Sequence, residues 1–317
     1  MARCFVLVLI VCLSAIRVGA AEEASEAQDW PVYTLDKAEV FTLETGPFGN
    51  FQASALLRTH SGELLTLSDT APTIYRIEVP NTPGPALIAP ITNAFTKAQL
   101  APYAAEKIDR YDCEGLAEDG QGRIYICEEA NRWILRWDPK SNSVERLAID
   151  WSPVARHFST DRNASFEGIA IAGNRMYVAN ERQMAVIIEV DLQTLKVVDH
   201  FVVVPRTFNW LGMHYSDLSW FDGKLYVLCR QNRVILEVNP ETHQVLAEFN
   251  YHKLEDQLGY LKPIPGVGLM EGLSVDRDDF WMVPDTNGYG RKRNPDDTRP
   301  RLLRCPRPQR APPAESK

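Results

Sequence analysis

The chain has 317 residues, of which 45% are hydrophobic, and its formal net charge is −8. That length suits one large domain or two ordinary ones. The acidic balance repels phosphate backbones at long range and argues against a nucleic-acid partner. Six cysteines in a chain of this length exclude a small disulfide-stapled scaffold.

The N-terminus predicts export. Arg3 gives a positive start, residues 4–16 form a short apolar run, and residues 18–20 are small. The apolar run is too short to span a bilayer comfortably. We therefore expect residues 1–20 to be a cleaved signal peptide and the protein to be secreted or periplasmic. The alternative is an uncleaved anchor. No later segment is predicted to cross a membrane.

A five-fold internal repeat then fills the chain. Each copy opens on a short motif such as Glu-Gly-Leu and continues through two apolar runs around a turn, and the copies begin at Ser54, Glu114, Glu167, Ser216 and Glu271. Repeats spaced by about fifty residues, with several short strands in each, are typical of β-propeller blades. The sequence thus predicts an all-β protein.

Each repeat supplies the first two strands of a predicted blade, and apolar segments after it supply a third and a fourth antiparallel strand. Five blades then cover residues 50–305, and a strand from residues 30–44 is expected to complete the last blade, because a closed ring hides its edge strands. The alternative is a sixth, degenerate blade built from residues 30–50 and 286–305. We expect one domain over residues 30–305, loops at 83–112 and 147–165, and a disordered Pro-rich tail at 306–317.

The hairpin register places both ends of each repeat side by side, away from the turn. Because the first strand of a propeller blade lines the central channel, the five starting residues are expected to form a ring at one axial mouth. The last residues of the repeats form a second ring just outside it, made of Asp69, Glu129, Glu181, Arg230 and Asp285. Asp217 adds a carboxylate in the fourth blade.

So many carboxylates near one axis repel each other unless a cation lies between them. Ca²⁺ suits such a site because it accepts six to eight oxygen ligands in loose geometry. The predicted metal ligands are Glu114, Glu167, Glu271, Asp217 and Glu181. In the alternative, the glutamates accept hydrogen bonds from backbone amides and only brace the blades.

Basic residues follow the strand ends beside the same mouth. Carboxylates, arginines and a metal together suit a small anionic ligand. The predicted substrate-binding residues are Glu129, Arg182, Arg230 and Asp285. His214, just before the fourth repeat, is a candidate general base. The alternatives are salt bridges for the arginines and a hydrogen-bonded position between blades for His214.

The repeat openings, with the endings Ile-Tyr-Ile-Cys-Glu-Glu, Met-Tyr-Val-Ala-Asn-Glu and Met-Val-Pro-Asp, resemble the SdiA-regulated propellers and the related family called esterase-like activity of phytase. The resemblance covers about residues 50–290. It implies an exported propeller with an acidic central site that holds Ca²⁺, and the family name implies phosphoester hydrolysis. The first and fourth repeats depart from the pattern, because they open on Ser54 and Ser216, and the fourth ends in Arg230.

Three functions remain open from the sequence. The leading hypothesis is a metal-dependent hydrolase of a phosphoester or a related ester, acting as a monomer. A propeller that only binds a small ligand or a peptide is the second. A metal-dependent lactonase of the gluconolactonase type is the third.

Overall fold

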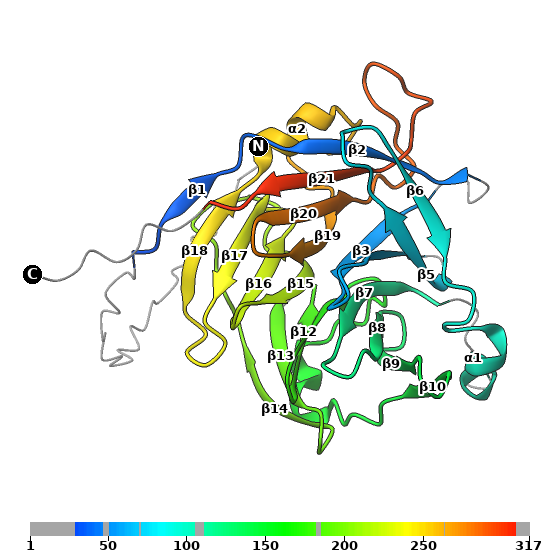
Figure 1. The fold of residues 1–317 in the computed structure, drawn as a ribbon. Coiled ribbons are helices and arrows are strands. Elements are labelled where there is room, and N and C mark those ends of the chain that lie inside the picture. Colours follow the sequence, from blue (N-terminus) through cyan, green and yellow to red (C-terminus); the bar gives the residue numbers. More distant parts are fainter. Residues whose placement is uncertain are drawn as a thin grey trace, which may run out of the picture.

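The computed structural model describes residues 29–46, 51–69, 71–104, 111–181, 185–262 and 264–308. It is a five-bladed β-propeller, with the blades arranged around one axis (Figure 1). The expected all-β class is confirmed. The predicted signal peptide at 1–20 lies outside the described residues, as do residues 309–317 of the predicted tail.

The first three blades follow the chain in order. Blade 1 contains β3 (Ala53–Arg58), β4 (Leu64–Ser68), β5 (Ala71–Glu78) and β6 (Pro85–Pro90). Blade 2 contains β7 (Cys113–Glu118), β8 (Ile124–Glu128), β9 (Trp133–Asp138) and β10 (Ser143–Arg146). Blade 3 contains β11 (Phe166–Ala172), β12 (Arg175–Asn180), β13 (Val186–Asp191) and β14 (Lys196–Phe201).

The last two blades take strands from both ends of the chain. Blade 4 contains β15 (Tyr215–Phe221), β16 (Lys224–Cys229), β17 (Val234–Val238) and β18 (Val245–Asn250), with β1 (Val32–Thr34) added in parallel outside β18. Blade 5 contains β19 (Met270–Val275), β20 (Asp279–Pro284), β21 (Arg301–Pro306) and, outermost, β2 (Glu39–Glu44).

β2 closes the ring. It pairs antiparallel with β21 and parallel with β6, so blades 5 and 1 share one eight-stranded sheet (Figure 1). The structure therefore decides for five blades and against the sixth. β21 follows a loop after β20 and takes the third position of blade 5, and the N-terminal strand β2 takes the fourth, outermost position.

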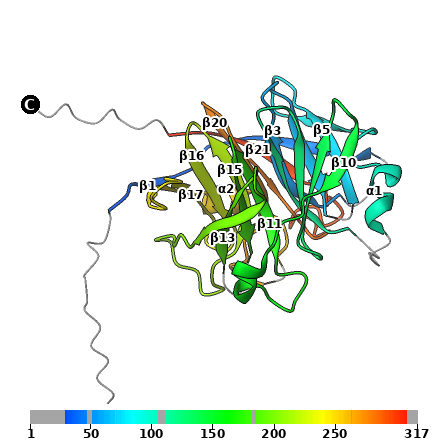
Figure 2. The same cartoon turned by 90° about the horizontal axis from the view of Figure 1, so that it is seen from below.

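The two segments predicted as loops contain regular elements. Residues 83–112 include β6 and the helix α1 (Lys97–Ala104), and residues 147–165 include a 3-10 helix (Ser152–His157). The prediction missed β6 because this strand begins and ends with a proline, Pro85 and Pro90, and prolines usually indicate a loop. An outer strand of a blade tolerates them. α1 lies at the edge of the molecule beside β10 (Figures 1 and 2), where the Tyr103 hydroxyl donates to the Val144 carbonyl at 3.2 Å. A second helix, α2 (His252–Leu258), precedes blade 5.

Apolar packing lies between blades. Five clusters of buried side chains each join two successive blades, including one between blades 5 and 1. The innermost strands contact their neighbours in a closed ring, in the order β3, β7, β11, β15, β19 and back to β3. This continuous packing holds the strand ends at the axis in fixed positions.

The glycine of each Glu-Gly-Leu or Glu-Gly-Ile opening permits this close approach. A Cβ atom on Gly168 would lie 2.6 Å from the Cα of Asp217 on the next inner strand, and one on Gly272 would lie 2.7 Å from the carbonyl carbon of Ala55. Only a residue without a side chain lets two backbones pass at that distance. The motif is therefore a packing requirement of the inner ring as well as a marker of the repeat.

Candidate functional site

The first residue of every repeat occupies a β-bulge. In each inner hairpin the strand pairing skips one residue, and the skipped residues are Ser54, Glu114, Glu167, Ser216 and Glu271. A bulge leaves one residue out of the ladder and redirects its side chain. The same irregularity in five blades thus turns five side chains toward one end of the axis, which we call the mouth.

Backbone hydrogen bonds hold the second ring beside the first. The amide of Glu129 donates to the carbonyl of Asp112 at 2.7 Å, and the amide of Glu181 donates to the carbonyl of Ser165 at 2.7 Å. Arg230 and Asp285 make the equivalent bonds, at 2.9 Å each, to His214 and Leu269. The last residue of each of these repeats therefore lies next to the residues that precede its own inner strand.

Blades 2 and 3 contribute the acidic half of the mouth. Carboxylate oxygens of Asp112, Glu114 and Glu129 lie within 4.8 Å of one another, and so do those of Glu129, Glu167 and Glu181. Glu129 belongs to both groups and is 1% exposed. Its Oε1 accepts the Ser165 amide at 2.9 Å, which fixes the shared carboxylate in place.

Burial and mutual repulsion disfavour the ionised form of these carboxylates. Burial and, to a smaller extent, the charges of Glu181 and Asp112 together raise the pKa of Glu129 to about 8, although the hydrogen bond from the Ser165 amide opposes the rise. Burial also raises the pKa of Glu114 well above its ordinary value, with added repulsion from Glu129 and Asp112. The pKa of Glu167 is raised in the same way by burial, Glu181 and Glu114. Such a cluster either keeps protons at neutral pH or binds a cation.

Blades 3, 4 and 5 contribute a second half in which opposite charges meet. Arg230 forms an ion pair with Glu271, and its other terminal nitrogen lies 3.5 Å from Oε1 of Glu181. The Nδ1 of His214 lies 3.3 Å from the same Glu181 oxygen. Gln231 approaches that Nδ1 at 3.4 Å. Glu181 is therefore the residue at which the two halves of the mouth touch.

Asp217 has a different environment from the one predicted. Its Oδ1 accepts the Leu218 amide at 2.8 Å and its Oδ2 accepts the Leu273 amide at 2.7 Å. Burial raises the pKa of Asp217 strongly although backbone amides, including that of Leu56, oppose the shift. It is a fully buried brace between inner strands, and it is outside both groups of neighbouring carboxylates.

The other predicted residues divide between the two halves. The structure brings Glu114, Glu167, Glu181 and Glu129 together, and it sets Glu271 and Asp285 beside Arg230. Arg182 lies outside the described residues. Sequence reasoning missed Asp112, whose signal was its place directly before the second inner strand, opposite the end of the repeat.

The donor set fits Ca²⁺. All of the clustered groups offer oxygen, the ligand that calcium prefers, and Glu167 and Glu129 come from adjacent blades. Glu271 is 6% exposed, and its Oε2 has no hydrogen-bond partner within the described part of the chain. Buried oxygens without partners are costly unless a donor or a cation reaches them.

The fold and this mouth define a class: a five-bladed propeller with an acidic axial site. The chain belongs to the phytase-like family described as esterase-like activity of phytase, whose model matches residues 46–288. A comparison with curated proteins finds no match.

Among solved structures, the chain is similar to the glutaminyl cyclase of Myxococcus xanthus, with a TM-score of 0.57 and 13% identity over 87% of this chain and 97% of that one. It also matches the virginiamycin B lyase of Staphylococcus aureus, with a TM-score of 0.41 and 15% identity over 80% and 68% of the two chains. At these identities, the likeness to the cyclase shows the propeller fold alone. No helix among the described residues has the length and apolarity needed to cross a membrane.

Proposed function

We propose that the protein hydrolyses a phosphoester or a related ester at the mouth, with Ca²⁺ bound among its carboxylates. The observation that carries the proposal is that a buried carboxylate cluster, the guanidinium of Arg230 and the imidazole of His214 meet at Glu181. The family to which the chain belongs supports an esterase-like reaction.

Each half of the mouth has a role in this proposal. Glu129, Glu167 and Glu181 would hold the cation. Calcium bound there would polarise an ester oxygen and offset negative charge that develops on it. Arg230 would attract an anionic group, since it is the only basic residue at a position where the other four repeats carry acids. Its ion pair with Glu271 means that a ligand must compete with a carboxylate for the guanidinium.

His214 would act as the general base. Its side chain is 14% exposed, and its Nδ1 faces Glu181. A carboxylate beside the imidazole stabilises the positive charge that the ring acquires when it takes a proton from water. Glu181 would therefore position the histidine as well as contribute to the cation site.

The rim of the mouth favours an ester with an apolar group. Phe208 and Trp210 are 86% and 69% exposed on the loop between β14 and β15, which leads into His214. The side chain of Asn209 anchors this loop by donating to the carbonyls of Gln231 and Gly266. Aromatic side chains exposed next to a polar site offer area for the apolar part of a ligand.

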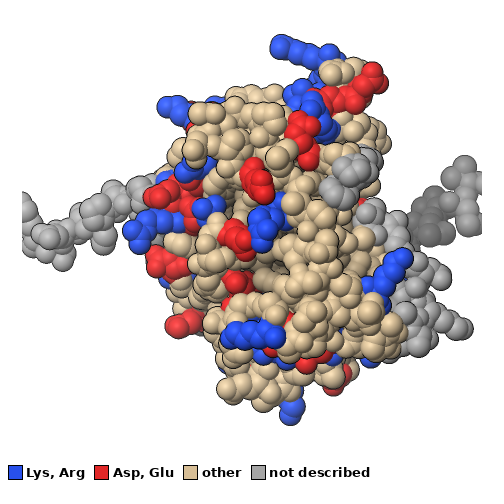
Figure 3. All heavy atoms as spheres, turned by 45° about the vertical axis from the view of Figure 1, so that its right-hand side comes forward, with Lys and Arg blue, Asp and Glu red and all other residues tan. Residues whose placement is uncertain are grey.

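On the face drawn in Figure 3, acidic and basic side chains are interspersed, and no broad basic area is seen. This supports a small ligand more than a nucleic acid. The composition of residues 1–20 supports an exported protein, which the N-terminus of the mature chain, read by mass spectrometry, would test.

The experiment uses chain stripped of metal and then supplied with Ca²⁺, with p-nitrophenyl phosphate and p-nitrophenyl butyrate as substrates. Hydrolysis should require Ca²⁺. Glu167→Gln should lose both the turnover and the rise in melting temperature that Ca²⁺ causes. His214→Asn should keep that rise and lose about 10²–10⁴-fold in kcat. Glu145→Gln, on the outer strand β10, is the matched control.

Three outcomes would contradict the proposal. A Ca²⁺-induced rise without hydrolysis of either ester would indicate a propeller that only binds. Turnover of lactones alone would indicate a lactonase. Equal melting curves with chelator and with Ca²⁺ would leave the glutamates as structural braces.

A further inference from the structure

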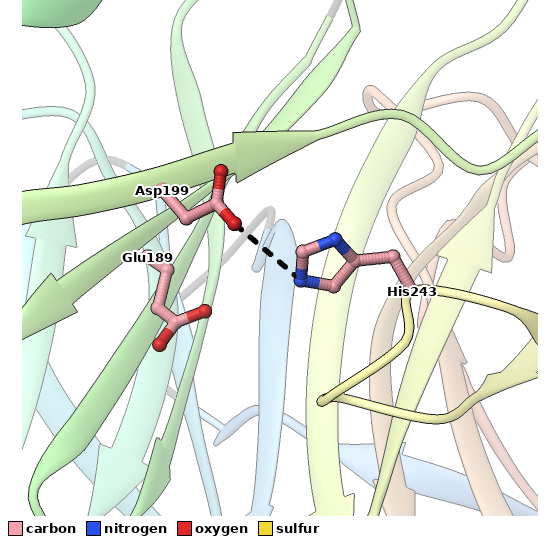
Figure 4. A group of neighbouring side chains, drawn as sticks. All are labelled: Glu189, Asp199 and His243. Atoms are coloured by element: carbon pink, nitrogen blue, oxygen red, sulfur yellow. Dashed lines mark ion pairs between the residues drawn. The ribbon is translucent and has the colours of Figure 1, made fainter.

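A second group of side chains that can bind a metal lies away from the mouth, between the outer strands of blades 3 and 4. Glu189 is on β13, Asp199 is on β14, and His243 is in the turn between β17 and β18 (Figure 4). One ligand atom from each lies within 4.8 Å of the other two. The ester-hydrolysis proposal assigns no role to any of the three.

The two carboxylates are direct cross-strand neighbours, because Glu189 pairs with Asp199 in the β13–β14 register. Like charges placed opposite each other on a sheet destabilise it. Burial and Asp199 both raise the pKa of Glu189, although the charges of Arg175 and His243 oppose them. Arg175 neutralises part of this pair, with its Nε 3.1 Å from Oε1 of Glu189.

His243 is held with its ring facing the carboxylates. The ring stacks on Phe201 with a centroid distance of 3.8 Å and an interplanar angle of 5°. The backbone amide of His243 donates to the Asn239 carbonyl at 2.9 Å, which closes the turn. Its Nε2 then lies 3.9 Å from Oδ2 of Asp199 (Figure 4). That separation is too long for a hydrogen bond.

The separation is close to that of two ligands on one ion. Ligand bonds of about 2.0–2.2 Å in a tetrahedral site place neighbouring ligand atoms roughly 3.4 Å apart. Asp199 is 52% exposed and can turn toward the ring without disturbing the core. Imidazole with two carboxylates suits Zn²⁺ and similar transition metals, whereas Ca²⁺ prefers oxygen ligands alone.

We propose that Glu189, Asp199 and His243 bind a divalent transition metal such as Zn²⁺, which ties blade 3 to blade 4. The remaining coordination position would be filled by water, since the site lies at the surface. Arg175 keeps its contact with Glu189 and limits the affinity by charge repulsion. The bound ion connects β13 and β14 to a turn more than forty residues further along the chain.

The test titrates Zn²⁺ by calorimetry into chain that carries no histidine tag, with Ca²⁺ present in excess so that the mouth is occupied. Co²⁺ absorption spectra report ligation directly. His243→Ala should weaken the site by more than about tenfold. Asp199→Asn, at a half-exposed position, tests the same site if His243→Ala folds poorly. His200→Ala, on the same strand as Asp199, is the matched control and should bind as the wild type does.

Zn²⁺ should raise the melting temperature of the wild type and of His200→Ala, and should leave that of His243→Ala and Asp199→Asn unchanged. Equal Zn²⁺ affinities and Co²⁺ spectra in all four proteins, or no binding by the wild type, would overturn the proposal. Neither result bears on ester hydrolysis, which is measured without added Zn²⁺.

Discussion

The mouth and the loop between β20 and β21 both bury carboxylates, and they treat these groups in opposite ways. In the loop, Asp297 is contacted by Arg291, Arg299 and Arg301, each at 2.8 Å. The hydrogen bond from Arg299 and the charges of Arg301 and Arg291 hold the pKa of Asp297 well below its usual range. At the mouth, the pKa of Glu129 is raised to about 8.

The two regions differ in the charges that surround each carboxylate. Asp297 forms ion pairs with two arginines of its own loop and with Arg301, the first residue of β21. Glu114, Glu129 and Glu167 instead crowd together, and the charges of neighbouring carboxylates add to the rise in the pKa of each. The fold thus places three arginines on one buried loop carboxylate and leaves the central carboxylates in mutual repulsion, and the calcium proposal rests on this contrast.

The largest effect is expected at Asp297. Asp297→Asn should lower the free energy of unfolding by about 2–4 kcal/mol, because Arg301 is buried, while Arg291 and Arg299 remain partly in water and lose less. That corresponds to roughly 5–15 °C in melting temperature. Asp296→Asn, on the adjacent exposed residue, is the control. An unchanged melting temperature for Asp297→Asn would remove the contrast between the two regions.

The ion pair between Arg230 and Glu271 tests the cationic half of the mouth. Arg230→Met should destabilise the fold by about 2–3 kcal/mol, because Glu271 is left buried without its partner. Glu271→Gln should cost less, and the double variant should cost less than the two single changes together. Melting curves for the four proteins give the coupling. Additive effects would show that the pair is not coupled in solution.

Calcium binding tests the acidic half. Glu129→Gln removes the carboxylate shared by both neighbouring groups and relieves repulsion, so it should not lower stability in chelator. The rise in melting temperature with Ca²⁺ should disappear, whereas at one hundred times the dissociation constant the wild type gains about 2.7 kcal/mol. Glu145→Gln should retain the rise. Retention of the full rise by Glu129→Gln would place the ion elsewhere.

The pH dependence of stability should separate the two regions. The folded pKa of Glu129 is about 8 against an ordinary value of 4.5, so folding favours its protonated form. Without metal, its contribution is fully present below pH 4.5 and is lost as the pH rises toward 8. Asp297 has a lowered pKa, so its contribution is lost only in acid, below its ordinary value of 3.8.

Melting temperatures measured between pH 4.5 and 8 should therefore fall in chelator and change less with Ca²⁺, which binds the ionised carboxylates. A flat profile in chelator would show that the mouth glutamates ionise without penalty, and would contradict the repulsion described above. This effect is the smallest of the four because several groups share the protons.

The sequence by itself determined the blade repeat and the turn of each inner hairpin, but not the bulge that takes the first residue of every repeat out of the strand pairing. The Glu-Gly-Leu and Glu-Gly-Ile openings recur because a glycine is needed where inner strands pass, and alternating apolar runs specify strands locally. The start positions at Glu114, Glu167 and Glu271 could be placed at the axis for this reason. The family resemblance rested on the same residues and is confirmed.

Only the tertiary structure decided how these residues are grouped. The closure by β2 requires residues 39–44 to meet residues 301–306, a contact that no local pattern specifies. Whether Glu271 faces Arg230 or the other glutamates depends on how the side chains of the adjacent blades 4 and 5 meet. Backbone amides of two inner strands donate hydrogen bonds to Asp217. Glu189, Asp199 and His243 lie together only because blades 3 and 4 pack side by side. Local propensities fix strands, whereas packing between blades sets which charges become neighbours.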